Sequence, residues 1–302
     1  MKLLIVDNLG AGMGEGSIYE FVRVFMQDGD EVAIRSTGGQ TRIEHMLADA
    51  ASFDGVIASG GDGTVAAVCS ALAGTGVPIL PFPAGTANLA ASENLELPSE
   101  VHALAKLVRE QRTLDFDLGE FEAGGVKTCF VMMAGAGFDG SIMRTAAPLK
   151  QRLGSFAYYQ AVVSNVMPPV AHFELDIDGV REEVDALGIL GINFSKMQAG
   201  VSITHENHPR DGYLDVALLK GKTAFDLLPA VSAALRDVEG DVPDRAQVEF
   251  RRAKEVRAVC SPALDTQFDG EPLKQESSFT LRVLPSATRF FVTEDAYRNF
   301  AE

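Results

Sequence analysis

A run of six residues, Ser59-Gly60-Gly61-Asp62-Gly63-Thr64, has the composition of a phosphate-binding turn. It follows a strand-like apolar stretch and opens a helix-like one, so its glycines bring main-chain N–H groups close to an anion at a helix N-terminus. Asp62 is unusual there, because a carboxylate repels phosphate unless Mg²⁺ lies between them or the carboxylate accepts a proton from an attacking hydroxyl. The run indicates phosphoryl transfer, although by itself a tight turn with an Asp N-cap explains it equally well.

A second glycine loop, Pro81-Phe82-Pro83-Ala84-Gly85-Thr86-Ala87-Asn88, lies one strand–helix unit later. Two such loops at the carboxyl ends of adjacent parallel strands face one crevice, which is where open α/β sheets bind ligands. Together they favour a nucleotide phosphate site over two structural turns. A third glycine cluster, which begins at Asn8, closes the first predicted strand and could join the same crevice.

A pair of acids stands near the carboxyl terminus, in Phe268-Asp269-Gly270-Glu271. On a strand, residues two apart share a face, so both carboxylates could act on one metal ion or proton unless Gly270 bends the chain. The tetrapeptide alone favours the other interpretation, an Asp-Gly turn followed by a solvated Glu.

These segments need a scaffold, and up to about residue 118 the chain alternates strand-like and helix-like stretches, the order that builds a parallel α/β sheet. Strands are predicted at residues 3–6, 31–34, 53–58 and 77–80, and helices near residues 17–25, 41–47, 64–73 and 99–109. Beyond residue 118, short strands and turns predict a mostly antiparallel β domain, with a hairpin around Asp178-Gly179. Helices are expected within it near residues 138–149, 155–166 and 223–235.

The chain of 302 residues carries 26 Lys and Arg against 42 Asp and Glu, a net charge of −16. Such a field repels the phosphate backbone of nucleic acid and an anionic bilayer, which argues against a nucleic-acid partner. The three cysteines lack the spacing of a disulfide framework or a zinc site, so they are expected to be buried thiols in a reducing compartment. Apolar tracts stay below the ~20 residues that span a bilayer, so the prediction is a cytoplasmic protein with no transmembrane segment.

Two motifs, Gly61-Asp62-Gly63-Thr64 and Pro83-Ala84-Gly85-Thr86-Ala87-Asn88, resemble the nucleotide-binding half of the diacylglycerol kinase catalytic-domain family, which includes sphingosine, ceramide and bacterial lipid kinases. Further matches follow in order, at Asp115-Phe116-Asp117-Leu118-Gly119, Gly135-Ala136-Gly137-Phe138-Asp139, Lys150-Gln151-Arg152-Leu153-Gly154-Ser155-Phe156-Ala157-Tyr158, Asp211-Gly212-Tyr213-Leu214-Asp215-Val216 and Phe268-Asp269-Gly270-Glu271. The resemblance runs from residue 3 to about residue 285.

The resemblance implies an α/β N-terminal domain with a parallel sheet, as in NAD kinases and diacylglycerol kinases, followed by a C-terminal antiparallel β-sandwich domain. The first domain would span residues 1–118 and take back a returning segment at about residues 286–302, and the lipid-substrate domain would span residues 119–285. The implied activity is transfer of the γ-phosphate of ATP, held between the domains with Mg²⁺, to a hydroxyl of a lipid such as diacylglycerol, ceramide or a sphingoid base. The enzyme would be cytoplasmic and transiently peripheral at the membrane that presents its lipid, and the resemblance allows a homodimer.

The family's functional residues are carried over only where this sequence matches its motifs. ATP contacts are implied for Asn8, Thr37, Gly61, Gly63, Thr64, Gly85, Thr86 and Asn88. The implied catalytic acids are Asp62, Asp117, Asp269 and Glu271, which would serve a Mg²⁺ and water network with Asp269 as the base. Asp62 is also an implied metal ligand, and Asp211 resembles the carboxylate of a separate structural site for Mg²⁺ or Ca²⁺.

The sequence departs from the family pattern in two loops. Asn8 is followed by Leu9, where members usually have Pro and then a basic residue, and Glu93 stands where a cation is expected after Asn88. Charge neutralisation of ATP must then come from elsewhere. Two alternative functions remain: a kinase of a soluble metabolite, since the Gly-Gly-Asp-Gly turn also resembles NAD kinases, and a nucleotide or lipid sensor without turnover.

Overall fold

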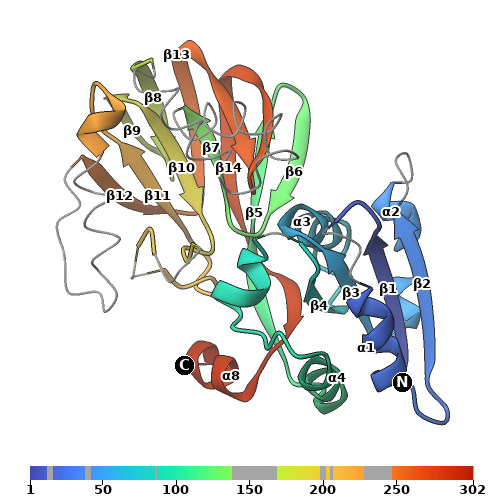
Figure 1. Cartoon of the computed structure of the whole chain (residues 1–302). Helices are drawn as coiled ribbons and strands as arrows, with labels where there is room; N and C mark the ends of the chain where they lie inside the picture. Colours follow the sequence, from blue (N-terminus) through green and yellow to red (C-terminus); the bar gives the residue numbers. More distant parts are fainter. Residues whose placement is uncertain are drawn as a thin grey trace. The chain divides into compact units, whose positions relative to one another are not determined.

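The computed structural model describes residues 1–11, 16–37, 42–85, 87–137, 169–197, 202–204, 207–227 and 247–301 (Figure 1). Its contacts divide the chain into two units. Unit 1 contains Met1–Leu118 and Pro285–Glu302, and unit 2 contains Gly119–Leu284. Each unit has its own set of strands and its own buried apolar side chains.

Unit 1 contains a parallel sheet. Its strands are β1 (Lys2–Asn8), β2 (Glu31–Thr37), β3 (Gly55–Gly60), β4 (Pro78–Pro83) and the last part of β14 (Glu271–Phe291). They lie in the order β2-β1-β3-β4-β14, and each neighbouring pair is parallel. Every residue of β3 is buried, as expected for a central strand covered on both faces, whereas the residues of edge strand β2 are exposed or half-buried. The predicted parallel sheet is confirmed.

Helices cover both faces of this sheet. They are α1 (Ser17–Phe25), α2 (Ile43–Met46), α3 (Asp62–Ala71) and α4 (Val101–Glu110). α1 lies beside α4, and α2 lies beside α3, which places the two pairs on opposite faces when the crossovers are right-handed. α1 buries Ile18, Phe21 and Phe25 at helical spacing, and its N-cap is Gly16, with φ 66°.

Three shorter or later elements complete unit 1. The helix predicted near residues 41–47 is a single turn, α2, followed by a 3₁₀ turn at Ala50–Ser52. A π-helical segment at Leu89–Asn94 follows the second glycine loop. The last helix, α8 (Glu294–Ala301), places Phe300 against Phe116, with ring centroids 5.3 Å apart, so the chain's end packs onto unit 1.

Unit 2 is an antiparallel β structure. Its strands are β5 (Thr113–Ala123), which begins in unit 1, β6 (Val126–Phe130), β7 (Met133–Gly137), β8 (Ala171–Ile177), β9 (Val180–Ala186), β10 (Gly188–Ile192), β11 (Leu214–Leu219), β12 (Val248–Ala253), β13 (Glu255–Phe268) and the first part of β14. The main order is β12-β11-β10-β7-β13-β14, while β8 pairs with β13 and β9, and β5 with β6. β8 and β9 form the predicted hairpin, in which Asp178 and Gly179 have φ of 50° and 88°, values of a type I′ turn. The predicted antiparallel domain is confirmed.

Strands β7 and β10 of unit 2 approach each other closely. A Cβ on Gly135 would lie 2.0 Å from the carbonyl oxygen of Ile189 in β10, so only glycine fits there. The motif Gly135-Ala136-Gly137-Phe138-Asp139 resembles a glycine-rich turn of the family; its first three residues belong to β7, and the last two lie outside the described residues. Small side chains serve the packing of two strands here.

Some predictions fall outside the described residues. They include the helices near residues 138–149 and 155–166 and most of the helix near 223–235, whose first residues form a 3₁₀ turn, Ala224–Leu227. Among the helices that the structure describes, none is long and apolar enough to span a bilayer. The three cysteines are buried free thiols, as predicted.

Candidate active site

The first glycine loop joins β3 directly to α3. Gly61 is the N-cap of α3, and no side chain caps this helix end. In the part of the chain that the structure describes, the amide N–H groups of Asp62 and Gly63 face no acceptor, as is usual in a first helical turn. The side chain of Thr64 lies over Gly60, where an added Cβ would come within 2.4 Å of Thr64 Oγ1. Two backbone donors and a hydroxyl therefore meet at one helix N-terminus, a geometry that binds anions.

The second glycine loop touches the first. A Cβ on Gly85 would lie 2.3 Å from the Cα of Gly61, so the two backbones are in contact and glycine is required. Asn88 closes this loop: its Oδ1 accepts the Gly85 N–H at 2.8 Å, and its Nδ2 donates to the Gly85 carbonyl at 2.9 Å. Asn88 has a left-handed backbone, with φ 52°, which asparagine tolerates better than most residues. Thr86, a predicted ATP contact, lies outside the described residues.

Asn8 links the ends of three elements. Its Oδ1 accepts the Gly10 N–H at 3.0 Å and the Thr37 hydroxyl at 3.3 Å, and its Nδ2 donates to Thr64 Oγ1 at 2.9 Å. The ends of β1 and β2 and the first turn of α3 are thus joined through one side-chain amide. The structure brings Asn8, Thr37 and Thr64 together at the carboxyl edge of the sheet, beside the touching glycine loops.

Asp62 is half-buried at the first position of α3. One carboxylate oxygen, Oδ1, accepts the Ala90 N–H at 3.0 Å, which ties the first loop to the π-helical segment after the second. Its Oδ2 has no partner among the described residues. A carboxylate oxygen is therefore available beside unpaired backbone N–H groups, a combination that suits a metal-bound phosphate.

Asp117 has a different setting within unit 1. Its side chain is only 1% exposed, and its Oδ1 accepts the Ser286 N–H at 2.7 Å. This bond ties β5 to the segment by which β14 returns to unit 1. The contact gives Asp117 a clear structural role, and its predicted part in a metal network stays a prediction.

Sequence reasoning missed one acid of this region, Asp7. It is 7% exposed at the end of β1, and its Oδ1 accepts the Ser59 hydroxyl at 2.8 Å. Asp7 and Ser59 are register partners, so both side chains lie on the sheet face opposite Asn8. The signal that could have found it is a charged residue at the end of an otherwise apolar strand.

Asp269 of unit 2 is held by backbone donors. Its Oδ2 accepts the Val131 N–H at 2.7 Å, and its Oδ1 accepts the N–H groups of Met132 and Met133 at 2.8 and 3.0 Å. Asp269 and Gly270 have φ of 44° and 82°, so the chain turns there and Glu271 pairs with Phe268 across the hairpin. Of the two interpretations of this tetrapeptide, the structure confirms the Asp-Gly turn, so the two acids do not share one face of a strand. Gly270 bends the chain, and exposed Glu271 begins the next strand.

Asp211 is paired within unit 2. Its Oδ1 accepts the Tyr213 N–H at 2.9 Å, and its carboxylate forms an ion pair with Arg252, whose guanidinium also lies over the Tyr213 ring. In the described ranges, no three His, Cys, Asp or Glu side chains gather in one place as ligands of one metal ion. A structural cation held by Asp211, with main-chain carbonyls as its other ligands, stays a prediction.

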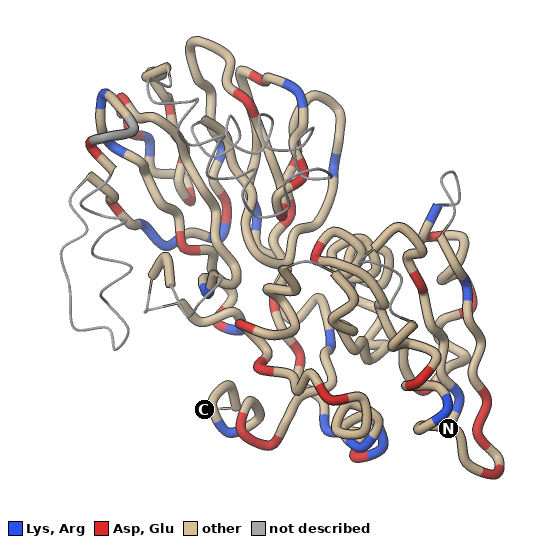
Figure 2. Tube along the Cα trace, viewed as in Figure 1, with Lys and Arg blue, Asp and Glu red and all other residues tan. Residues whose placement is uncertain are grey.

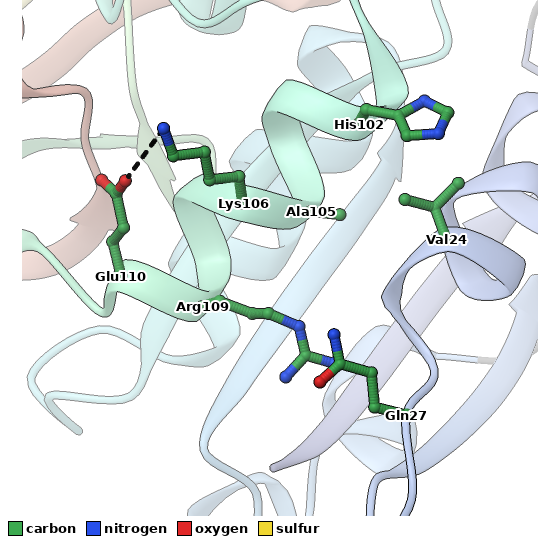
Figure 3. A pocket seen from close by; sticks show the side chains of 7 residues that line it. All are labelled: Val24, Gln27, His102, Ala105, Lys106, Arg109 and Glu110. Carbon is green, nitrogen blue, oxygen red and sulfur yellow. Dashed lines mark ion pairs between the residues drawn. The ribbon is translucent and has the colours of Figure 1, made fainter.

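A surface pocket of about 340 Å³ lies elsewhere in unit 1 (Figure 3). It is lined by Val24, Gln27, His102, Ala105, Lys106, Arg109 and Glu110, from α1, the turn after it and α4. Arg109 donates to Asp30, which also accepts from the N-terminal ammonium of Met1. That ammonium, followed by Arg109, holds the pKa of Asp30 far below its ordinary value. The pocket is therefore at the amino end of the strands, and none of the predicted site residues lines it.

Two family models match the chain. The diacylglycerol kinase catalytic domain matches residues 2–121, and the YegS C-terminal NAD kinase beta sandwich-like domain matches residues 132–292. Among curated proteins, a diacylglycerol kinase of Mycobacterium tuberculosis strain H37Rv is 30% identical, over 78% of this chain and 77% of its own. A probable lipid kinase, YegS-like, of Klebsiella pneumoniae strain 342 is 27% identical, over 95% of this chain and 94% of its own.

Solved structures show the same fold at lower identity. A putative diacylglycerol kinase from Bacillus anthracis strain Sterne superposes with a TM-score of 0.74 at 19% identity, covering 98% of each chain. An NAD kinase from Archaeoglobus fulgidus in complex with ATP gives a TM-score of 0.57 at 14% identity, covering 100% of this chain and 97% of that one. The family models and the curated relatives show that the chain belongs to the diacylglycerol kinase catalytic-domain family and is a lipid kinase.

Proposed function

We propose that this lipid kinase uses ATP and Mg²⁺ to phosphorylate a hydroxyl of a membrane-derived lipid, with diacylglycerol as the first candidate and ceramide or a sphingoid base next. The observation that carries the proposal is the contact between Gly61 and Gly85, which places two glycine loops around one helix N-terminus. The names of the Mycobacterium tuberculosis and Bacillus anthracis proteins support diacylglycerol as the first lipid to test.

The donor groups of unit 1 fit a metal-bound triphosphate. The N–H groups of Asp62 and Gly63 and the positive end of α3 attract phosphate oxygens. Asp62 Oδ2 is a hard oxygen ligand without a partner among the described residues, which suits Mg²⁺. When bound, Mg²⁺ would spread the charge that develops as the phosphoryl group moves.

In this proposal, residues of the chain itself bind and orient the phosphate, exclude water and accept the proton. The first turn of α3 binds and orients the phosphate, and the Thr64 hydroxyl donates to it. Gly85 and Asn88 keep the second loop against the first, which excludes water from one side of the phosphate. Asp269 stays the proposed base, and a lipid proton received there would compete with the N–H donors that surround its carboxylate.

The test of the reaction is an assay with radiolabelled ATP over mixed micelles that each contain one lipid. The panel consists of diacylglycerol, ceramide, sphingosine and a micelle without acceptor, with NAD⁺ as a soluble acceptor. Label on diacylglycerol is the expected result. Label on NAD⁺ alone would support the soluble-metabolite alternative. ATP binding without label on any acceptor would support the sensor.

The carboxylate of Asp62 is tested by Asp62→Asn. An asparagine can still accept the Ala90 N–H but loses the charge that a metal ion needs, so kcat should fall by at least ~10² while the fold is kept. Asp28→Asn, at an exposed residue in the turn after α1, removes the same charge at the other end of the strands and should leave kcat unchanged. Equal kcat values in the two variants would remove Asp62 from the mechanism.

A further inference from the structure

The proposed phosphate site of unit 1 is almost without cations. Residues 3–22 and 43–105 contain no Lys or Arg, and they include the end of β1, both glycine loops and all of α3. The tube of Figure 2 carries no blue along these stretches. ATP keeps a net negative charge even with one Mg²⁺ bound, and Asp62 adds another negative charge. A local cation would offset this repulsion.

Two arginines stand near the end of β2, and they differ in how they are used. The Arg35 side chain is used in internal contacts: its Nη2 donates to Asp49 Oδ2 at 2.7 Å, and its guanidinium also donates to the Met46 carbonyl. The hydrogen bond to Asp49 raises the pKa of Arg35. Arg42 is exposed, and its side chain has neither an ion pair nor a hydrogen bond among the described residues, although its backbone carbonyl accepts the His45 N–H. Of these two arginines, Arg42 is therefore the one whose side chain is not used in a contact with another described residue.

Arg42 is also close enough to serve the site. It directly precedes α2, which lies beside α3 on the same face of the sheet. β2 and β3 flank β1, so their ends are about 10 Å apart, twice the usual strand spacing of about 4.8 Å. The hydrogen bonds from Thr37 to Asn8 and from Asn8 to Thr64 join the end of β2 to the first turn of α3. The length of an arginine side chain adds to the reach of Arg42 from this position.

We infer that Arg42 binds the phosphate chain of the nucleotide and supplies the positive charge that the glycine loops lack. The inference rests on the proposed function and names a ligand residue for it. A guanidinium suits this task because its planar array of donors matches two phosphate oxygens at once and stays charged at every physiological pH. The site would then combine backbone donors from α3, a metal ion at Asp62 and one side-chain cation from the end of β2.

The experiment measures the dissociation constant of Mg²⁺–ATP by calorimetry for the full chain and three variants. Arg42→Gln removes the charge, Arg42→Lys keeps it without the planar donor array, and Arg23→Gln is the matched control. Arg23 is exposed in the last turn of α1, at the amino end of the strands, and has no partner within the described ranges. Thermal unfolding of each variant accompanies the titrations and should be unchanged, because neither arginine side chain has an internal partner among the described residues.

The expected result is a dissociation constant at least ~10-fold higher in Arg42→Gln, a partial recovery in Arg42→Lys and no change in Arg23→Gln. The salt dependence of binding should also be shallower in Arg42→Gln, because one ionic contact is lost. Equal dissociation constants for Arg42→Gln and Arg23→Gln would overturn the inference while leaving the proposed function in place. A wild-type chain that binds no Mg²⁺–ATP would overturn both.

Discussion

Asn8 controls the direction in which the Thr64 hydroxyl points. Gly10 N–H can only donate, so Asn8 Oδ1 must face it and Asn8 Nδ2 must donate to Thr64 Oγ1. The Thr64 proton is then directed away from Asn8, toward the space above the first turn of α3. Asn8 therefore acts as a positioning residue, which the sequence alone could not distinguish from an ATP ligand.

Replacing Asn8 with Asp should reverse that hydroxyl. A carboxylate accepts the Thr64 proton and adds a negative charge beside the phosphate, so kcat/KM for ATP should fall by ~10-fold to ~100-fold. Steady-state kinetics of Asn8→Asp, Thr64→Val and the double variant form the measurement. If Asn8 acts through Thr64, the double variant is hardly worse than Asn8→Asp; losses that add fully in free energy would contradict the positioning role.

Asp269 accepts hydrogen bonds from the connection between β6 and β7, and Asp269→Asn tests how much these bonds contribute to the free energy of unfolding. The amide can replace only one carboxylate oxygen, and its NH₂ group would face an N–H donor of residues 131–133. The free energy of unfolding in urea should fall by about 1–3 kcal/mol. Glu271→Gln, two residues away and exposed, should leave it unchanged. An Asp269→Asn chain as stable as wild type would mean that these bonds are dispensable.

At the residue scale, sequence reasoning located groups better than it located their partners. The sequence singles out Gly61 and Gly85 because each belongs to a glycine loop after a predicted strand. It singles out Asp62 because a carboxylate is unexpected in a phosphate-binding turn. The internal bonds of Asn88 and Asp269 depend on a left-handed backbone and on residues far along the chain, and no local pattern encodes either. Such bonds are visible only once the chain has folded.

Elements were predictable where burial follows a simple pattern. The strands of unit 1 are short apolar runs between turns, and all four predicted runs are strands. β7 was not predicted because Met133–Gly137 carries too few large side chains to resemble a strand. Gly135 is required by the neighbouring strand β10, because a side chain at this position would clash with the carbonyl oxygen of Ile189. A strand built from small residues that allow a neighbouring strand to approach closely shows no hydrophobic periodicity, so its sequence does not resemble a strand.

The β8–β9 hairpin should make stability depend on pH. His172 pairs with Asp185 across the strands at 2.9 Å, and this bond, followed by the charges of Asp185, Glu183 and Glu174, raises the pKa of His172 above its ordinary 6.5. A raised folded-state pKa gives stability that is fully present below pH 6.5 and is lost as pH rises through the folded value. Urea midpoints of wild type and His172→Gln should therefore differ in acid and converge in mildly alkaline buffer.

The control for this pH effect is His208→Gln, at an exposed histidine of unit 2 that is outside the hairpin. Its midpoints should follow wild type at every pH. A difference between wild type and His172→Gln that persists above the folded pKa would show that packing, rather than charge, holds the hairpin.

At the scale of the whole molecule, composition predicted the two-part character of the chain. Alternating strands and helices before residue 118, and short strands after it, correspond to a parallel sheet in unit 1 and antiparallel strands in unit 2. Composition did not show that the chain passes from one unit to the other within β5 and within β14. Each of these strands begins in one unit and ends in the other.

The net charge of −16 should govern how this lipid kinase meets its substrate surface. An anionic vesicle repels the chain, and salt screens that repulsion: the Debye length falls from ~30 Å at about 0.01 M to ~10 Å at about 0.1 M. At saturating ATP, the KM for diacylglycerol in anionic vesicles should therefore fall as salt rises over this range. The same titration on zwitterionic vesicles should leave the KM flat. A KM that rises with salt on anionic vesicles would mean that a local basic surface, rather than the summed charge, brings the enzyme to the membrane.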